Sequence, residues 1–426
     1  MSKAASVSNY EFMSIFKDGV EVPLEGKTVS FSYYESIKSP NITANMIVVD
    51  TGNSVSYPKE YDTQQRIGSI YNALPLTGRE QLKFKINSTL GKLDFTNKPL
   101  FVNGINNPDQ NSQREAILLS LFSEGAKLNS ESDVKGKYVG NIGDSVKNIL
   151  NQFLTSKSDS VEIFDIQPTA NPYSFLGGSK SAFEICCNLG SKSLSKKDSA
   201  GYFFFETQDG FNFKSIDSLV SQEPVEKYFK EGALRDHIDN PGNDLKILSS
   251  TVRKNQNVLN ALDAGVFYSR NIFFNPKTFK EEEIEYKFTE GKLIERLASS
   301  VEAPDVNAHT KTHYNILDIG TLDPTVAGKD NNNPNDYQAQ AAMRYNILFS
   351  QLVDIQVPCN PNLRAGDTIE CYFEMITQSK KEQGVYDPVQ SGKYLIVDLC
   401  HHFEPTRSIT SLTLARDSYG LYTEKN

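Results

Sequence analysis

Two segments near the end of the chain decide the fold: LRAGDTIECYF, from Leu363 to Phe373, and SGKYLIVDLCHHFEPTRSITSLTLARDSYG, from Ser391 to Gly420. They contain three strand-like runs, each bounded by turn residues. In the first run, polar and apolar side chains alternate, which predicts one wet face (Thr368, Glu370, Tyr372) and one buried face (Ile369, Cys371, Phe373). The other two runs are Tyr394 to Leu399 and Ile409 to Leu414. The three runs together predict an antiparallel meander.

The composition is that of a globular protein with several cores. The chain has 426 residues, of which 38% are hydrophobic and 23% charged, and this length suits two to four domains. A net charge of −9 argues against a surface that holds nucleic acid by neutralising phosphates. The sequence contains neither an apolar run long enough for a membrane helix nor a signal peptide, so we expect folding in a cytoplasm and no membrane contact. The five cysteines form no CxxC pair and are expected to be reduced and structural.

The first quarter of the chain reads as short strands separated by turns. Strands are expected at residues 10–16, 27–34, 42–50, 80–88 and 100–102, with a polar loop and a short helix between 54 and 77. Alternation is clearest in the fourth strand, where Leu82, Phe84 and Ile86 share one face. Such spacing suggests a small barrel or sandwich.

Helical signals follow in the second quarter. Ser112 to Glu115 has the pattern of a capping box, and Ile117, Leu118, Leu121 and Phe122 then recur at helical spacing up to Gly125. Further helices are expected at residues 143–154 and 181–189, followed by a hairpin with strands 202–207 and 211–216. Residues 108–216 therefore predict a separate α/β module.

The third quarter gives weaker signals. Strands are expected at residues 245–252, 266–274 and 279–288, and Asp336 can cap a helix that reaches Phe349. Between them, Ala303 to Asn335 contains three prolines and an Asn-rich run, which predicts a loop or exposed arm.

Several residue pairs resemble catalytic or metal sites, and each has a plainer explanation. Neighbours on a strand point to opposite faces, so His401 and His402 are not expected to chelate one ion. His309 and His313 have the spacing of a helical metal pair but lie among turn residues, and the acidic run from Glu281 to Glu285 is typical of a solvated face. Glu206 and Asp209 flank a hairpin turn, where acidic residues are common, although glycosidases use such pairs. With no nucleotide-loop, nucleophile-elbow or zinc motif in the sequence, we expect no catalytic, cofactor-binding or metal-binding residues.

Two parts of the chain resemble the central hub proteins of contractile-tail baseplates, found in tailed phages and related injection machines. One part is Arg364 to Asp367, Ser391 to Ile396, His401 and Arg416 to Gly420; the other is Asn171 to Leu176 and Gly201 to Leu219. Together they cover about a quarter of the sequence. The resemblance implies a β-rich α+β fold, with two tube-type antiparallel β-barrel domains, an inserted α/β domain and a second insertion.

The resemblance also implies a domain order. The first barrel would span residues 1–107 and the middle α/β domain 108–216. The second barrel would start in 217–250 and be completed by 345–426, with the insertion 251–344 between its parts. The Asn-rich arm and the lack of an obvious strand match between the barrels depart from the family pattern.

In that family, a homotrimer shows six barrels to the hexameric tail tube and meets the trimeric spike below. The expected partners are thus a second and third copy of the chain, the spike, a tube or tube-initiator protein and, as a further candidate, the tape measure protein. DNA would pass through without specific binding, and the protein would reside in the virion baseplate. A cell-wall-degrading or glycan-binding tail component and a general β-rich interaction module are the alternative hypotheses.

Subunit contacts are expected where strand edges of the closing meander meet across copies. The residues predicted for these contacts are Thr368, Ile369, Cys371, Phe373, Ile409 and Leu412, with Arg416 and Asp417 as interface or corner-stabilising charges. An ion pair within one chain is the equal alternative for the two charges.

Overall fold

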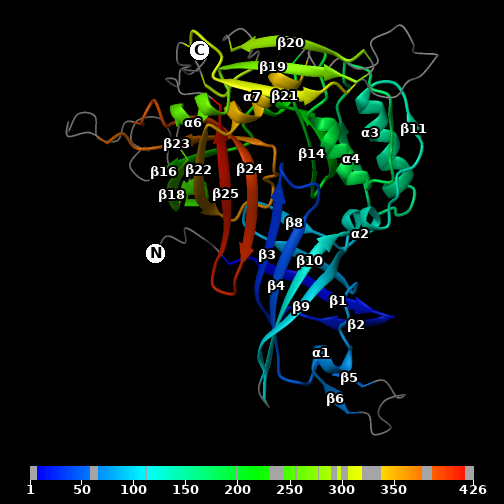
Figure 1. Cartoon of the computed structure of the whole chain (residues 1–426). Coiled ribbons are helices and arrows are strands. Elements are labelled where there is room, and N and C mark those ends of the chain that lie inside the picture. Colours follow the sequence, from blue (N-terminus) through cyan, green and yellow to red (C-terminus); the bar gives the residue numbers. More distant parts are fainter. Residues whose placement is uncertain are drawn as a thin grey trace.

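The computed structural model describes most of the 426 residues. Described are residues 7–57, 66–110, 113–197, 199–230, 243–254, 257–276, 278–288, 295–298, 306–318, 337–376 and 386–417. Figure 1 shows two β-barrels, the first in blue and cyan and the second in green, orange and red, with a helical module and a small sheet beside them. The two-barrel, β-rich α+β architecture expected from the sequence is confirmed.

The first barrel is built from eight strands of the first 123 residues. They are β1 (Asn9–Lys17), β2 (Val20–Pro23), β3 (Thr28–Ser36), β4 (Thr43–Asp50), β7 (Gln81–Asn87), β8 (Lys92–Asp94), β9 (Leu100–Gln110) and β10 (Glu115–Ser123). The strand order is β3-β4-β10-β9-β7-β1-β2. Its first and last strands, β3 and β2, are connected by residues 24–27 alone, so the sheet must curl round on itself. Alternation places Leu82, Phe84 and Ile86 in its core, as predicted.

The loop between β4 and β7 carries the expected short helix and, in addition, two short strands. These are the paired strands β5 (Val55–Ser56) and β6 (Ile67–Gly68) and the helix α1 (Ile70–Ala73). Ser69 caps this helix by accepting a hydrogen bond from the Asn72 amide.

The predicted helix after Ser112 is wrong. Glu115 to Ser123 form strand β10, which pairs antiparallel with β4 on one side and β9 on the other. Ile117, Leu119 and Leu121 are buried at alternate positions, and this period-2 pattern wins because two flanking strands supply hydrogen bonds along its length. Ser112, the expected cap, lies outside the described residues.

The second barrel is assembled from two distant parts of the chain. Its strands are β16 (Lys227–Lys230), β17 (Lys246–Ile247), β18 (Ser249–Lys254), β22 (Gln351–Pro358), β23 (Thr368–Tyr372), β24 (Gly392–Phe403) and β25 (Ser408–Arg416), with the short 3₁₀ turn η2 (Asn243–Leu245) before β17. The order β18-β22-β25-β24-β23-β16-β17 closes at Leu248, the single residue between β17 and β18. The predicted meander β23-β24-β25 is confirmed.

The prediction that one face of β23 is exposed to solvent is wrong. All five of its residues are buried, because residues 222–226, which lead into β16, cover the face that alternation left for water. Thr368 donates a hydrogen bond to the Gln222 carbonyl, and Tyr372 stacks on Phe229 of β16 with ring centroids 4.9 Å apart.

The two barrels share one continuous sheet. Strand β24 pairs antiparallel with β3, from Asp398 opposite Ser36 to Phe403 opposite Phe31. The same hydrophobic core cluster contains buried residues from both barrels. This β3–β24 pairing, called the seam below, fixes the barrels side by side.

The middle module packs helices around a three-stranded sheet. Its elements are α2 (Glu124–Ser130), β11 (Lys137–Tyr138), α3 (Ile142–Leu150), the π-helical turn η1 (Asn151–Thr155), β12 (Ile163–Ile166), β13 (Phe175–Leu176), α4 (Ala182–Gly190), β14 (Tyr202–Thr207), β15 (Gly210–Ser215) and α5 (Ile216–Ser221). The two helices and the hairpin predicted there are confirmed. The predicted start of this domain at 108 stays a prediction, although β10 pairs within the first barrel.

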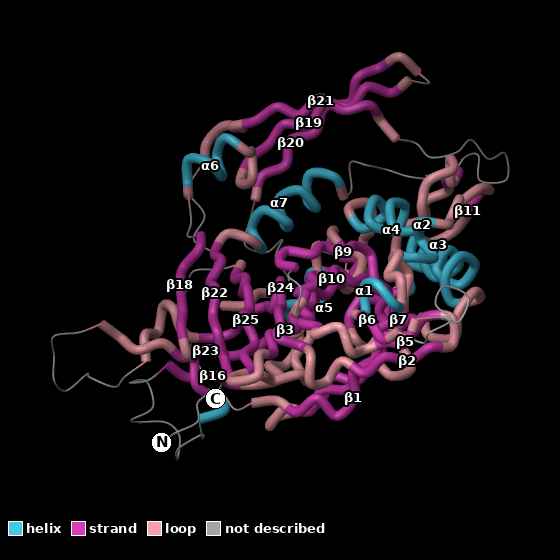
Figure 2. Tube along the Cα trace, turned by 90° about the horizontal axis from the view of Figure 1, so that it is seen from below, coloured by secondary structure: helices cyan, strands magenta, loops and turns pink. Residues whose placement is uncertain are grey.

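The insertion forms a second small sheet above the helices (Figure 2). It contains α6 (Val258–Asp263), β19 (Tyr268–Asn275), β20 (Lys280–Lys287) and β21 (Lys311–Ile316), and α7 (Gln338–Leu348) leads back to the barrel. Within the predicted arm, Lys311 to Ile316 is a strand that pairs parallel with β19, so the loop prediction is wrong there. The rest of that arm, apart from residues 306–318, lies outside the described residues, as does Asp336.

Candidate functional site at the junction of the barrels

The tip of the β14–β15 hairpin lies where the middle module meets both barrels. Its two-residue turn, Gln208 and Asp209, is followed by Gly210 at φ +133°. A Cβ atom on Gly210 would stand 2.6 Å from the Glu162 carbonyl oxygen, so a side chain has no room here. The absence of a side chain lets the tip fit tightly against the chain that leads into β12.

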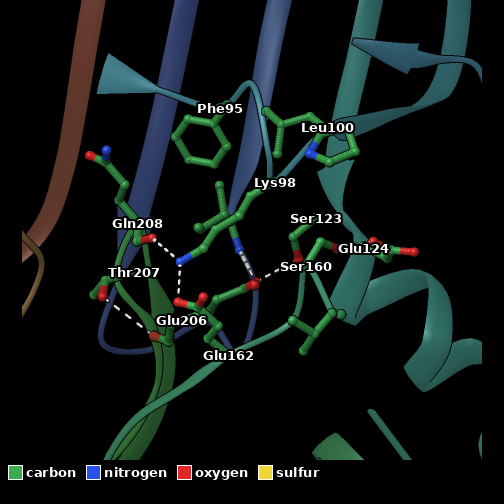
Figure 3. Close-up of a pocket in the computed structure, with 15 residues that line it drawn as sticks. Phe95, Lys98, Leu100, Ser123, Glu124, Ser160, Glu162, Glu206, Thr207 and Gln208 are labelled. Atoms are coloured by element: carbon green, nitrogen blue, oxygen red, sulfur yellow. Dashed lines mark hydrogen bonds and ion pairs between the residues drawn. The ribbon is translucent and has the colours of Figure 1, made fainter. Parts of the chain in front are cut away.

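Glu206 fastens the hairpin to the first barrel. Its carboxylate accepts hydrogen bonds from the Ile42 amide at 3.0 Å and from the Ser123 hydroxyl at 2.5 Å (Figure 3). Burial raises the pKa of Glu206 to about 7, although these two hydrogen bonds act to lower it. The carboxyl group is therefore poised to change its charge near neutral pH.

Lys98 holds the same tip from the first barrel. Figure 3 shows its amine reaching toward Gln208 and Glu162. It donates a hydrogen bond to the Gln208 carbonyl at 3.3 Å and pairs with the Glu162 carboxylate at 2.7 Å. The cavity beside these groups measures about 20 Å³, which is room for about one water molecule and not for a sugar ring.

Glu35 joins all three parts of the junction. From β3 its carboxylate accepts hydrogen bonds from the Tyr33 hydroxyl (2.7 Å), the Gln208 amide of the tip (2.8 Å) and the Ala365 amide of the second barrel (2.9 Å). Burial raises the pKa of Glu35, and the nearby Arg364 guanidinium opposes that effect. One buried carboxylate thus links two barrels and the middle module.

The turn from Arg364 to Asp367 completes the junction from the second barrel. Arg364 pairs with Asp209 at 2.9 Å. Gly366 has φ +89°, and a Cβ atom there would stand 2.9 Å from the Phe205 ring. Its carbonyl accepts a hydrogen bond from Gln222 at 2.9 Å, which ties the turn to the chain after α5.

The two segments that carry the family resemblance therefore meet in space. Arg364 to Asp367 of the closing meander packs against the hairpin inside Gly201 to Leu219. Glu206 and Asp209, which the sequence offered as a carboxylate pair, are each bonded to groups that position the hairpin. The arrangement can hold three structural units at fixed angles.

The histidines and the acidic run lie in separate parts of the fold, and the turn expected around His313 is wrong, because this residue lies on β21. His401 points into the core, where burial lowers its pKa to about 3, whereas His402 bonds to Ser32 and Glu404 on the other face. His309 and His313 lie before and on a strand, not on a helix. Glu281 to Glu285 lie on the exposed strand β20. Among the described residues, no three His, Cys, Asp or Glu side chains gather in a way that could hold a metal ion.

The eight residues predicted for subunit contacts are all buried within this chain. They are Thr368, Ile369, Cys371, Phe373, Ile409, Leu412, Arg416 and Asp417. Arg416 donates a hydrogen bond to the Val389 carbonyl at 2.6 Å and lies over the Tyr394 ring, while Asp417 accepts one from the Leu297 amide at 3.0 Å. Their role in subunit contacts stays a prediction.

Sequence reasoning missed Glu35 and Lys98 as junction residues. A signal for Glu35 was present, because it follows Phe31 and Tyr33 at alternate positions and so places an acid in a buried row. Lys98 lies in an irregular segment and gives no such signal. Its partners are far away in the sequence.

Comparison with known proteins agrees with this architecture. No family model matches the chain. It is 22% identical over 371 residues to the probable baseplate hub protein gp334 of Vibrio phage KVP40, a match that covers 82% of this chain and 84% of that protein.

Two solved structures share the fold along nearly the whole length. The tail protein from Neisseria meningitidis MC58 has a TM-score of 0.53 at 10% identity, covering 96% of this chain and 97% of that one. The 43 kDa tail protein of prophage MuSo2 from Shewanella oneidensis also has a TM-score of 0.53, at 8% identity, covering 96% and 99%. The resemblance to baseplate hub proteins is thus confirmed: the chain is similar to a protein of that name over four fifths of its length and has the fold of these two tail proteins.

Proposed function

We propose that this chain is a structural baseplate hub of a contractile phage tail. The observation that carries the proposal is the pair of barrels that one chain joins through the seam and the buried junction. Similarity to a protein named as a probable baseplate hub supports it and places the chain in the tail baseplate of a virion. Glu206 and Asp209, the carboxylate pair that the sequence offered, instead hold the hairpin against the two barrels.

The finer proposal is a trimeric adaptor between tube and spike. Three copies would present six barrels to a six-fold tube while keeping three-fold symmetry toward a spike, which resolves the mismatch between the two. The partners would be two further copies, a spike protein, a tube or tube-initiator protein and the tape measure protein. The eight buried residues of β23, β25 and their flanks would act on subunit contacts by shaping these strands.

The acidic net charge supports the proposed role as a conduit for DNA. Three chains at −9 each would carry −27, and acidic patches along a central channel would let DNA pass without sticking. The described residues include no helix that is long and apolar enough to span a membrane.

Sedimentation velocity of the purified chain, alone and with its spike protein, tests the assembly. We expect a trimer with a central hole in electron micrographs, formed either by the chain alone or upon addition of the spike. A monomer or an even-numbered ring under both conditions would contradict the adaptor. Reproducible release of sugars from cell-wall material would instead favour the glycan-degrading alternative.

A further inference from the structure

The insertion sheet exposes one of its faces. Its strand order is β20-β19-β21, and each outer strand has β19 as its strand partner among the described residues. In β19 the side chains of Ser269, Asn271 and Phe273 are buried, whereas Phe274 is exposed. Because alternate residues point to opposite sides, the even-numbered positions of β19 form the outward face.

Register assigns the outward residues of the two outer strands. Paired residues share a face, and Ile272 lies opposite Tyr314 of β21 and Glu283 of β20. Two residues further along β19, Phe274 lies opposite Ile316 of β21 on one side and Glu281 of β20 on the other. The outward face therefore carries an apolar half over β19 and β21 and an acidic row on β20.

The apolar half is unusually exposed for such large side chains. Tyr314 is 76% exposed, Ile316 72% and Phe274 37%. Phe279, in the β19–β20 turn, is 78% exposed and packs edge-on against Phe274, with ring centroids 6.1 Å apart. Clusters of large apolar side chains on a surface mark interaction sites more often than single ones do.

Phe279 also has a strained backbone. Its φ is +56°, in the left-handed region that costs a bulky residue about 1–3 kcal/mol. Since its ring is exposed, burial does not repay this cost within the chain. Strain without a folding benefit points to a role in binding.

The acidic row supplies charge beside the apolar half. Glu281, Glu283 and Glu285 project on the outward face of β20, and Arg270 pairs with Glu283. Glu281 lies beside Phe274 and forms no ion pair with the described residues. A partner with basic side chains along one flank would complement this edge.

The dimensions fit one kind of partner. Strands lie about 4.8 Å apart, so the outward side chains of β21 and β20 are about 10 Å apart across β19. An α-helix with its side chains is about 10 Å wide. We propose that the outward face of the insertion sheet binds an amphipathic helix of a partner protein, with apolar residues on Phe274, Phe279, Tyr314 and Ile316 and Lys or Arg on the flank toward Glu281.

A labelled helical peptide of leucine and lysine tests this surface by fluorescence anisotropy with the full-length chain. The same peptide with glutamate in place of lysine is the charge control. We expect Tyr314→Ser with Ile316→Ser to weaken binding of the lysine peptide about tenfold or more, because two large apolar contacts are lost. Tyr71→Ser with Ile67→Ser removes the same residue types from exposed positions in the first barrel and should leave binding unchanged.

Two further variants separate strain and charge from general effects. Phe279→Gly should weaken binding while leaving thermal stability equal or higher, because glycine accepts positive φ. Ser179→Gly, also at positive φ (+58°) but in the middle module, should not affect binding. Glu281→Gln should weaken the lysine peptide about twofold to fivefold, whereas Glu21→Gln, on an exposed part of β2, should not.

The proposal is independent of the hub function and fails on clear outcomes. Equal binding of the glutamate peptide, or unchanged binding by the Tyr314 and Ile316 double variant, would overturn it. Self-association of the chain that this double variant abolishes would show that the occupant is a second copy, which also overturns it.

Discussion

At the scale of single residues, the junction depends on buried carboxyl groups. Glu206 and Glu35 each accept hydrogen bonds from backbone amides of another structural unit. The donors are backbone N–H groups, which every residue except proline carries. These two positions therefore require a side chain that is long enough to reach the amide and that ends in an oxygen acceptor. A glutamine can supply such an acceptor without the charge.

The raised pKa of Glu206 predicts a pH dependence. A pKa of about 7 in the folded protein lies above the unfolded value, so the stability linked to this group is present at low pH and lost as pH rises through 7. A glutamine does not ionise, so the variant Glu206→Gln does not lose stability at this position as the pH rises. We expect the stability of the variant relative to the wild type to rise by about 2–3 kcal/mol from pH 5 to pH 8.

Urea unfolding at the two pH values measures this difference. Glu21→Gln, on an exposed part of β2, controls for the removal of one acid from the chain. Parallel pH profiles for Glu206→Gln and the wild type would contradict the prediction.

A second prediction concerns Gly366, where backbone conformation and close packing coincide. Gly366→Ala should cost about 2–4 kcal/mol, because alanine is strained at φ +89° and its methyl group would overlap the Phe205 ring. Gly52→Ala is a matched control, since φ is +81° there but no atom lies within 4 Å of the added Cβ. It should cost only about 1 kcal/mol. Equal losses in the unfolding free energy would show that packing at the turn contributes nothing.

At the scale of elements, the helix α7 connects the insertion to the middle module. Its Arg344 forms a bidentate pair with Asp217 of α5, and both side chains are buried. Tyr345 bonds to the backbone of Tyr202 in β14. The insertion therefore returns to the barrel along a path that the hairpin itself helps to fix.

Removing one partner of this pair should be costly. Asp217→Asn would leave a buried guanidinium without its counter-charge, and we expect a loss of about 3–5 kcal/mol in the free energy of unfolding. Replacing both residues, as Asp217→Leu with Arg344→Met, should recover much of this loss. Chemical denaturation of the three proteins decides the matter; a loss below about 1 kcal/mol for Asp217→Asn would show that the pair is dispensable.

The individual strands and helices also show which parts of the fold could be predicted from the sequence. Strands with one polar face, such as β7, and helices with a capping serine, such as α4, follow from local pattern alone. The segment Glu115 to Ser123 fits both periods, and only its two strand neighbours decide for β10; one of them, β4, lies far earlier in the chain. The buried second face of β23 and the strand β21 likewise depend on distant partners. Junction residues such as Lys98 depend on such partners entirely.

At the scale of the whole molecule, the seam makes the two barrels one mechanical unit. The adaptor proposed above would need barrels that keep a fixed angle to each other. The backbone ladder from Ser36 to Phe31 opposite β24 and the shared core supply that rigidity. Interfaces between independent domains are smaller and more polar, and they allow relative motion.

This continuity predicts cooperative unfolding of both barrels. Calorimetry should show a single transition for them, and the amides of β3 and β24 should exchange hydrogen only through the same opening that exposes β7 and β25. Local opening of the seam would require breaking sheet hydrogen bonds while the buried rings of Phe31 and Phe403, 6.2 Å apart, remain packed. Two separate transitions, or faster exchange in β3 and β24 than in the other strands, would mean that the barrels are jointed. Barrels that move independently at the seam would not suit the proposed adaptor, because its two barrels could then change their angle.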